Sequence, residues 1–174
     1  AAVMEVSSHA LALRRADGIA FDIAAFTNLG HDHLNFHPDM EHYARSKARL
    51  FEILAESGKE ATAIVNLDDP AGERMLRASR VRPLTFGVRE HADVRARDVA
   101  MDMTSVSFQA TTPRGEVRVR LRHLGLYSVY NALAALAASE ALDLDLEATA
   151  AALASTPVVP GRFEIVDAGQ DFVV

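Results

Sequence analysis

The sequence predicts an α/β fold with a mostly parallel, doubly wound sheet and a small antiparallel subdomain. In the first half of the chain, short apolar runs of the kind found in buried strands alternate with helical patterns. From about residue 93 the pattern changes to strict alternation of apolar and polar residues, and alanine-rich helices follow. Strands that alternate with helices favour a parallel sheet, whereas alternation broken by a turn favours an antiparallel hairpin.

The first half is expected to supply the parallel part of the sheet. Four segments are predicted to be buried strands: residues 2–6, 21–27, 61–67 and 83–87. Apolar residues recur at helical spacing over residues 43–57, and Gly58 supplies a stop. A shorter helix is expected over residues 69–79, with Pro70 in its first turn.

The second half is expected to open with an antiparallel hairpin. Two runs of apolar residues alternate with polar neighbours: Val106, Phe108 and Ala110, then Val117, Val119 and Leu121. The sequence of residues 111–115 is typical of the turn between such strands. Helices are predicted over residues 128–142 and 146–154.

The domain boundary is expected near the end of the chain. Residues 1–155 should form part of one domain, and residues 156–162 break all periodicity, as a linker does. Residues 163–174 should begin a second domain. Both ends of the chain have apolar, strand-like runs, so we expect a piece of a longer polypeptide.

Composition and charge exclude several classes of protein. The 174 residues carry 18 basic and 24 acidic side chains, a net charge of −6, so no basic field attracts nucleic acid or an anionic membrane surface. No apolar run approaches the roughly 20 residues that span a bilayer. The lack of cysteine excludes disulfides, thiolate zinc sites and thiol nucleophiles. We therefore expect a cytoplasmic, monomeric chain that neither binds nucleic acid nor inserts into a membrane.

Residues 5–9 form the first candidate site, after the opening run. In α/β sheets, ligands bind beyond the carboxyl ends of the strands. The Glu5 carboxylate, two hydroxyls and an imidazole in this position suit a hard cation and a polar substrate. The structural alternative is an ordinary strand-to-helix turn in which Ser8 is the N-cap.

A second candidate site contains four of the seven histidines within twelve positions: His31, His33, His37 and His42. It also follows a predicted strand, so it should lie at the same edge of the sheet. For His37 and His42 we favour a role as solvated loop residues. The spacing lacks the helical pair of histidines with an intervening glutamate that zinc hydrolases carry, whereas a magnesium site with one histidine and several oxygens stays open.

Four separated segments together resemble the central domain of the Mur ligases, most closely the MurE type of tripeptide synthetase. These segments are residues 4–51, with MEVSSH and GHDHLNFH, residues 66–69 (NLDD), residues 130–135 (YNALAA) and residues 160–164 (PGRFE). The resemblance follows the family's order over nearly the whole chain. It implies a nucleotide-binding domain related to the P-loop NTPases, an ATP-dependent amide ligase activity, and ATP and Mg²⁺ as cofactors.

The resemblance implies a metal-binding set from three segments. Glu5 matches the family's magnesium-binding glutamate, and His33 matches its metal-binding histidine. The pattern around Lys47 by itself is typical of a solvated helix face. However, Lys47 stands fourteen residues after His33, where the family carries a carbamylated, catalytic lysine. A carbamate is an anionic oxygen ligand, whereas an ammonium would repel a metal ion.

The resemblance also implies contacts to both substrates. Ser7 and Arg15 match positions that contact the UDP-N-acetylmuramoyl peptide, Asn131 matches the residue that reads adenine, and Arg162 matches the arginine that reaches ATP phosphate. Leu13 departs from the polar glutamine that some relatives have, which puts one substrate contact in doubt. The family's glycine-rich phosphate loop is expected upstream of residue 1, so the isolated chain should be inactive.

The implied reaction adds a diamino acid, meso-diaminopimelate or L-lysine, to UDP-N-acetylmuramoyl-L-alanyl-D-glutamate through an acyl phosphate. This is a step in peptidoglycan precursor synthesis. Two alternatives stay open. One is a related ligase of the folylpolyglutamate or cyanophycin synthetase type, and the other is a catalytically silent Mur-like binding module.

Overall fold

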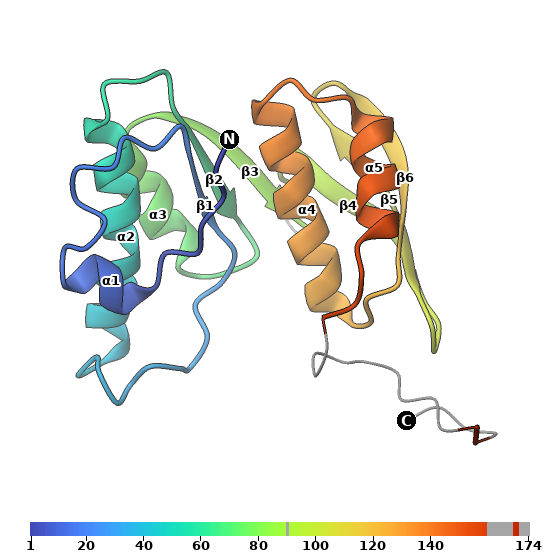
Figure 1. Cartoon of the computed structure of the whole chain (residues 1–174), viewed down its shortest axis with the longest axis horizontal. Helices are drawn as coiled ribbons and strands as arrows, with labels where there is room; N and C mark the ends of the chain where they lie inside the picture. The colour runs from blue at the N-terminus through green and yellow to red at the C-terminus, as the bar shows by residue number, and fades with distance from the viewer. Residues whose placement is uncertain (90, 160–168, 171–174) are drawn as a thin grey trace. The chain divides into compact units, whose positions relative to one another are not determined.

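The structure, a computed structural model of the chain, describes residues 1–89, 91–159 and 169–170. The chain divides into two compact units, Ala1–Thr85 and Phe86–Val174 (Figure 1). Each unit combines strands with helices, and parallel and antiparallel strands both occur. The predicted α/β class with an antiparallel part is therefore confirmed.

The first unit contains the parallel strands that the sequence predicts. β1 (Ile23–Phe26) pairs in parallel with β2 (Thr62–Asn66). β3 (Arg82–Gly87) follows β2 in hydrogen-bonding order and continues into the second unit. The helices of the first unit are α1 (Ser8–Ala12), α2 (Met40–Glu56) and α3 (Gly72–Ser79).

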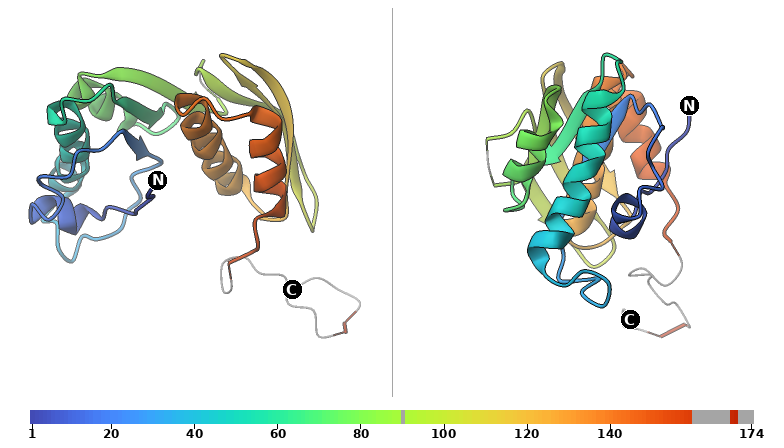
Figure 2. Two further views of the ribbon diagram at one scale, coloured as in Figure 1. Left: turned by 45° about the horizontal axis from the view of Figure 1, so that its top comes forward. Right: turned by 90° about the vertical axis from the view of Figure 1, so that its left-hand side faces the viewer.

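Helix α2 organises the core of the first unit. Its Phe51 packs in one cluster with Phe26 of β1 and Met75 of α3. Its Ile53 packs in a second cluster with Leu11 of α1. The right-hand view of Figure 2 shows α2 running between α3 and α1. Because α2 contributes to both clusters, it fixes the position of α1 relative to the strands of this unit.

The second unit is built on the antiparallel strands. The end of β3 pairs in parallel with β4 (Val94–Met101), and β4 pairs antiparallel with β5 (Val106–Thr112). β5 in turn pairs antiparallel with β6 (Gly115–Leu121). The helices α4 (Leu126–Ala141) and α5 (Leu146–Ser155) pack beside each other against these strands (Figures 1 and 2).

The predicted hairpin is confirmed in detail. The residues named from the alternation are all buried, and the residues between them are not: Val106, Phe108 and Ala110 in β5, and Val117, Val119 and Leu121 in β6. In register, Phe108 lies opposite Val119 and Ala110 opposite Val117. Opposed apolar residues on one face give the sheet its contact with the helices.

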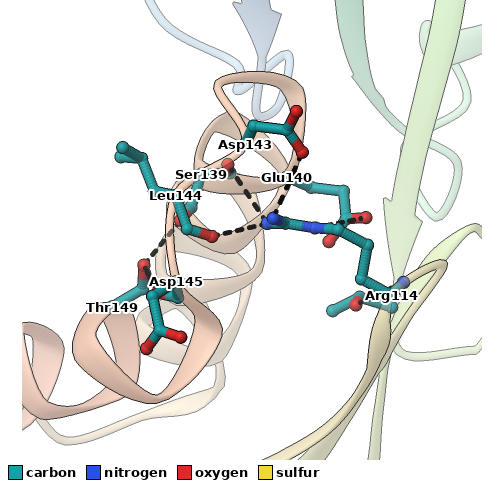
Figure 3. A network of polar contacts seen from close by, with 8 residues as sticks. Arg114, Ser139, Glu140, Asp143, Leu144, Asp145 and Thr149 are labelled. Atoms are coloured by element: carbon teal, nitrogen blue, oxygen red, sulfur yellow. Dashed lines mark hydrogen bonds and ion pairs between the residues drawn. The ribbon is translucent and has the colours of Figure 1, made fainter.

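Arg114, in the turn of the hairpin, binds groups at the C-terminal end of α4 (Figure 3). The Arg114 Nε atom lies 3.0 Å from Oε1 of Glu140, whose side chain is 7% exposed. Nη2 of Arg114 donates to the Leu144 carbonyl at 2.6 Å. The last carbonyls of a helix lack partners within the helix, so a cation at this end stabilises it.

The prediction of a strand over residues 2–6 is wrong. Residues 1–7 have no regular structure, and Val3 is fully exposed. A strand needs a neighbour for its N–H and C=O groups, and none of the described strands pairs with this segment. Apolar composition by itself therefore misassigned the segment.

Both helices that were predicted for the first half begin at other positions than expected. α2 begins three residues early, because the Asp39 side chain caps it by accepting the His42 N–H at 2.6 Å. α3 begins only at Gly72, and Pro70 lies in the turn before it. The expected linker is irregular over residues 156–159, and the rest of it lies outside the described residues. Nowhere in the described part of the chain is a helix both long and apolar enough to span a bilayer.

Candidate functional site

Tyr43, buried on α2, belongs to a cluster of aromatic and histidine rings in the first unit. Its ring stacks on that of His37, with the centroids 5.0 Å apart. The ring of His33 meets it edge to face at 5.7 Å. One helical turn further along α2, Nζ of Lys47 lies over the same ring, 5.5 Å from its centroid. Lys47 from α2 and His33 from the preceding loop therefore lie against one phenol ring.

The side chain of Lys47 is half-buried among carboxylates. Burial lowers the pKa of its amine, and the carboxylates of Glu5 and Asp69 oppose this effect by raising it. The net direction is downward, because desolvation disfavours the ammonium form. A buried lysine with a lowered pKa presents more of the neutral, nucleophilic amine at neutral pH.

Glu5 and His33 reach this region from two loops. Glu5 is exposed in the irregular segment before α1 and acts electrostatically on Lys47. His33 is exposed and has a φ of 61°, a left-handed conformation that non-glycine residues seldom adopt. The structure thus brings Glu5, His33 and Lys47 into one region, while their function as ligands stays a prediction.

Asp69 is a residue of this region that sequence reasoning missed. One of its carboxylate oxygens accepts the Leu29 N–H, and the other accepts the Ala71 N–H, both at 2.8 Å. The same carboxylate raises the pKa of Lys47. Asp69 belongs to the NLDD segment that follows β2, so its position at the end of a parallel strand was an available signal.

The side chains of Glu5, His33 and unmodified Lys47 supply only part of the ligands that a magnesium ion needs. Among the described residues, no group of three or more His, Asp or Glu side chains is arranged to hold a metal. Glu5 offers carboxylate oxygens and His33 a ring nitrogen, but an unmodified Lys47 offers no oxygen. Because Mg²⁺ prefers oxygen ligands, the set fits the ion if Lys47 carries a carbamate.

The two serines after Glu5 have different surroundings, since Ser7 is exposed and Ser8 is buried. Ser7, and not Ser8, is the N-cap of α1: its Oγ accepts the Ala10 N–H at 3.2 Å. Ser8 is buried, and its Oγ lies 2.8 Å from Nε2 of His37. Arg15 is exposed beyond the end of α1.

The assignment of His37 and His42 to a solvated loop is wrong. His37 is completely buried, and His42 is half-buried in the first turn of α2. Their Nδ1 atoms are 2.7 Å apart, a distance at which one ring donates a hydrogen bond to the other. Burial and three neighbouring histidines lower the pKa of His37. The sequence could not reveal this burial, because the partners Ser8 and Tyr43 come from other segments.

The second unit has a separate pocket of about 340 Å³ between the end of β6, α4 and the chain after α5. Asn131 lines it from α4, together with Tyr127, Leu121, His123 and Val159. The walls are mainly apolar, and the Asn131 amide is a polar group that could direct a hydrogen bond, a combination typical of small-molecule pockets. Arg162, the other predicted ATP-binding residue, lies outside the described residues.

Known proteins match the chain over nearly its whole length. A UDP-N-acetylmuramyl-tripeptide synthetase of Roseiflexus sp. (strain RS-1) is 47% identical over 184 residues, which cover 99% of this chain and 36% of that protein. A UDP-N-acetylmuramoyl-L-alanyl-D-glutamate--2,6-diaminopimelate ligase of Bacillus licheniformis is 43% identical, with the same two coverages. The chain spans about a third of the length of these curated relatives.

Solved structures and a domain family agree with these relatives. A structure of a UDP-N-acetylmuramoyl-L-alanyl-D-glutamate--2,6-diaminopimelate ligase superposes with a TM-score of 0.83 at 32% identity, over 93% of this chain and 34% of that chain. MurF from Acinetobacter baumannii superposes with a TM-score of 0.79 at 28% identity, over 85% of this chain and 32% of that chain. Residues 1–139 match the Mur ligase middle domain. The chain therefore belongs to the Mur ligase family, and residues 1–139 belong to the family's middle domain.

Proposed function

We propose that this chain is the central part of an ATP-dependent amide ligase of the MurE type. Its reaction would add a diamino acid, meso-diaminopimelate or L-lysine, to UDP-N-acetylmuramoyl-L-alanyl-D-glutamate. The observation that carries the proposal is the approach of His33 and Lys47 to the Tyr43 ring, with the Glu5 carboxylate acting electrostatically on Lys47, in a chain of this family. The names of the two relatives support the same class of substrate.

The chemistry of such a ligase has two steps. ATP transfers its γ-phosphoryl group to the free carboxylate of the D-glutamyl residue, giving an acyl phosphate and ADP. The amine of the diamino acid then attacks the acyl carbon, loses a proton, and inorganic phosphate leaves as the amide forms. Several anionic groups crowd together in both steps, so the main tasks of the protein are positioning and electrostatic stabilisation.

Lys47 would act as a carbamate. Its neutral amine would add to CO₂ and lose one proton, which leaves an anionic carboxylate on Nζ. Two features support this assignment: the side chain is half-buried, and burial lowers its pKa. The carbamate would convert a repulsive cation into an oxygen ligand beside Glu5 and His33. Mg²⁺ held by these three side chains would offset phosphate and carboxylate charge.

Ser7 and Arg15 would contact the UDP-N-acetylmuramoyl peptide. Ser7 lies two residues after Glu5, and Arg15 presents an exposed guanidinium at the other end of α1. A guanidinium suits the carboxylate and phosphate groups of this substrate because it donates two parallel hydrogen bonds. The Ser7 hydroxyl already accepts the Ala10 N–H, and its proton is available for a ligand.

The pocket of the second unit would hold the adenine of ATP. Asn131 supplies both a donor and an acceptor for the edge of the base, while Tyr127 and Leu121 supply apolar contacts. Arg162 would contact the ATP phosphates. Without the phosphate loop expected upstream, the isolated chain should bind ATP weakly, and micromolar binding by calorimetry would contradict this.

Replacement of Lys47 tests the proposal in the full-length ligase. The substitution Lys47→Ala should lower turnover by about 100-fold or more, because it removes an electrostatic group at the reacting centre. Added bicarbonate should not restore it. Lys59 is the only other lysine of this chain, and it pairs with Asp22 at an exposed site. Lys59→Ala is therefore the matched control, which should keep normal turnover.

The outcomes separate the proposal from its alternatives. Near-normal turnover of Lys47→Ala would contradict the assignment of Lys47. A full-length protein that forms an amide with glutamate on a folate, but not with the muramoyl peptide, would indicate a folylpolyglutamate-type ligase. A protein with no ATP-dependent ligation of any acceptor would indicate a silent binding module.

A further inference from the structure

His37 is the most deeply buried polar side chain of the first unit, and the function proposed above gives it no role. It is completely inaccessible to solvent. Both ring nitrogens have partners: Nε2 lies 2.8 Å from Oγ of Ser8, and Nδ1 lies 2.7 Å from Nδ1 of His42. A buried imidazole with both nitrogens engaged is held in one orientation, because any other would leave a polar atom unsatisfied.

These contacts join two segments that are distant in the sequence, the one with Ser8 and the one from His33 to Tyr43. Ser8 lies 29 residues before His37 and directly follows Ser7. The His37 N–H donates to the carbonyl of His33 at 2.9 Å, so the backbone of the two histidines is linked. On the other side, His42 adjoins Tyr43, whose ring stacks on His37 at an angle of 14°.

We propose that His37 is a positioning residue that locks the loop carrying His33 to the segment carrying Glu5. The inference rests on the proposed function, since it concerns the geometry of the same site. The segment before α1 has no regular structure, and Glu5 is exposed within it. The Ser8–His37 hydrogen bond gives this segment a fixed attachment three residues after Glu5.

The lock also sets the conformation of His33. The left-handed φ of His33 is unfavourable by itself, and such strain persists where the surroundings hold the residue. Two N–H groups, those of Phe36 and His37, donate to the His33 carbonyl, at 3.0 and 2.9 Å. Partners of metal-binding residues are commonly as important as the ligands, and their loss lowers metal affinity about 10- to 100-fold.

Paired substitutions at Ser8 and His37 in the full-length ligase test the lock. Ser8→Ala removes one end of the key hydrogen bond. His37→Asn keeps a polar group near the position of Nδ1 only, whereas His37→Gln places its amide near the position of Nε2 and can still reach Ser8. His31 is exposed in the same loop, so His31→Ala is the matched control.

Two measurements report on the lock. In ligation assays the Mg²⁺ concentration for half-maximal rate should rise about 10-fold for Ser8→Ala and His37→Asn, and His37→Gln should restore most of the difference. In hydrogen exchange by mass spectrometry, which needs no activity, residues 5–9 and 31–37 should exchange faster together in the first two variants. His31→Ala should resemble the unchanged protein in both measurements.

Several results would overturn the inference. One is a Mg²⁺ dependence within twofold of the unchanged protein in both Ser8→Ala and His37→Asn. Another is faster exchange throughout the first unit with no change in Mg²⁺ dependence, which would indicate a purely structural residue. If the unchanged full-length protein lacked ligase activity, the proposed function would fail, while coupled exchange of the two segments would still report on the lock.

Discussion

Replacing Arg114 with methionine should destabilise the second unit markedly, because the guanidinium serves several acceptors at once (Figure 3). It pairs with Glu140 at 3.0 Å and donates to the carbonyl of Leu144 at 2.6 Å. It also approaches the Ser139 carbonyl and the exposed Asp143 carboxylate, each at 3.4 Å. Methionine retains much of the apolar stem but no donor, so the nearly buried Glu140 side chain would lose its cationic partner.

The magnitude follows from the exposure of the two partners. Removing one partner of a fully buried ion pair costs about 3–5 kcal/mol. Here the Glu140 side chain is 7% exposed but that of Arg114 is 33% exposed, so solvent screens part of the interaction. We expect a loss of about 2–3 kcal/mol in the free energy of unfolding, or about 4–12 °C in melting temperature for a chain of this size.

Urea unfolding followed by circular dichroism measures the loss, and native-state hydrogen exchange assigns it to the second unit. Arg118→Met is the control, because Arg118 is exposed on β6 and its guanidinium donates to the Ser107 hydroxyl at 3.1 Å. The double variant Arg114→Met/Glu140→Met should be more stable than Arg114→Met, since it leaves no unpaired charge. The reasoning would be refuted if the free energy of unfolding of Arg114→Met lay within about 0.5 kcal/mol of that of the unchanged chain. It would also be refuted if the double variant were less stable than Arg114→Met.

Three further substitutions test the fold. Gly72→Ala should destabilise the first unit by about 1–3 kcal/mol, because a Cβ would collide with the backbone carbonyl of Asn66, and an unchanged urea midpoint would contradict this. Phe51→Ala should cost about 3–5 kcal/mol by the same measurement, since Phe51 is 1% exposed, and a loss below about 1 kcal/mol would show that the core collapses around it. Hydrogen bonds from Thr104 and Ser105 lower the pKa of Asp102 to about 2. The ionised Asp102 carboxylate therefore contributes its full stabilisation of the folded state above pH 3.8, and this stabilisation is lost as the pH falls through about 2. Carboxyl NMR should show that Thr104→Ala raises this pKa, and an identical titration in the variant would contradict the assignment.

Local sequence patterns were sufficient to predict most of the helices and strands. The alternation in β5 and β6 required only that one face be buried, and Gly58 after α2 marked the stop correctly. The predicted start of α2 was three residues late, because the prediction did not take account of Asp39 as an N-cap. An aspartate before a helical pattern is a known sign of a helix start. The apolar run at residues 2–6 failed for another reason, since no described strand pairs with it.

The candidate site was predictable only in its main members. Family resemblance selected Glu5, His33 and Lys47, and the folded chain brings them together. Neither spacing nor resemblance indicated that His37 is buried or that Asp69 influences Lys47.

The amino-acid pattern thus specifies which segments become helices and strands, because burial of one face repeats with the period of each element. The environment of individual polar side chains arises only when distant segments pack together. Ser8 and His37 illustrate this: each looks like an ordinary surface residue in its own segment, and each is buried because the other supplies its hydrogen bond.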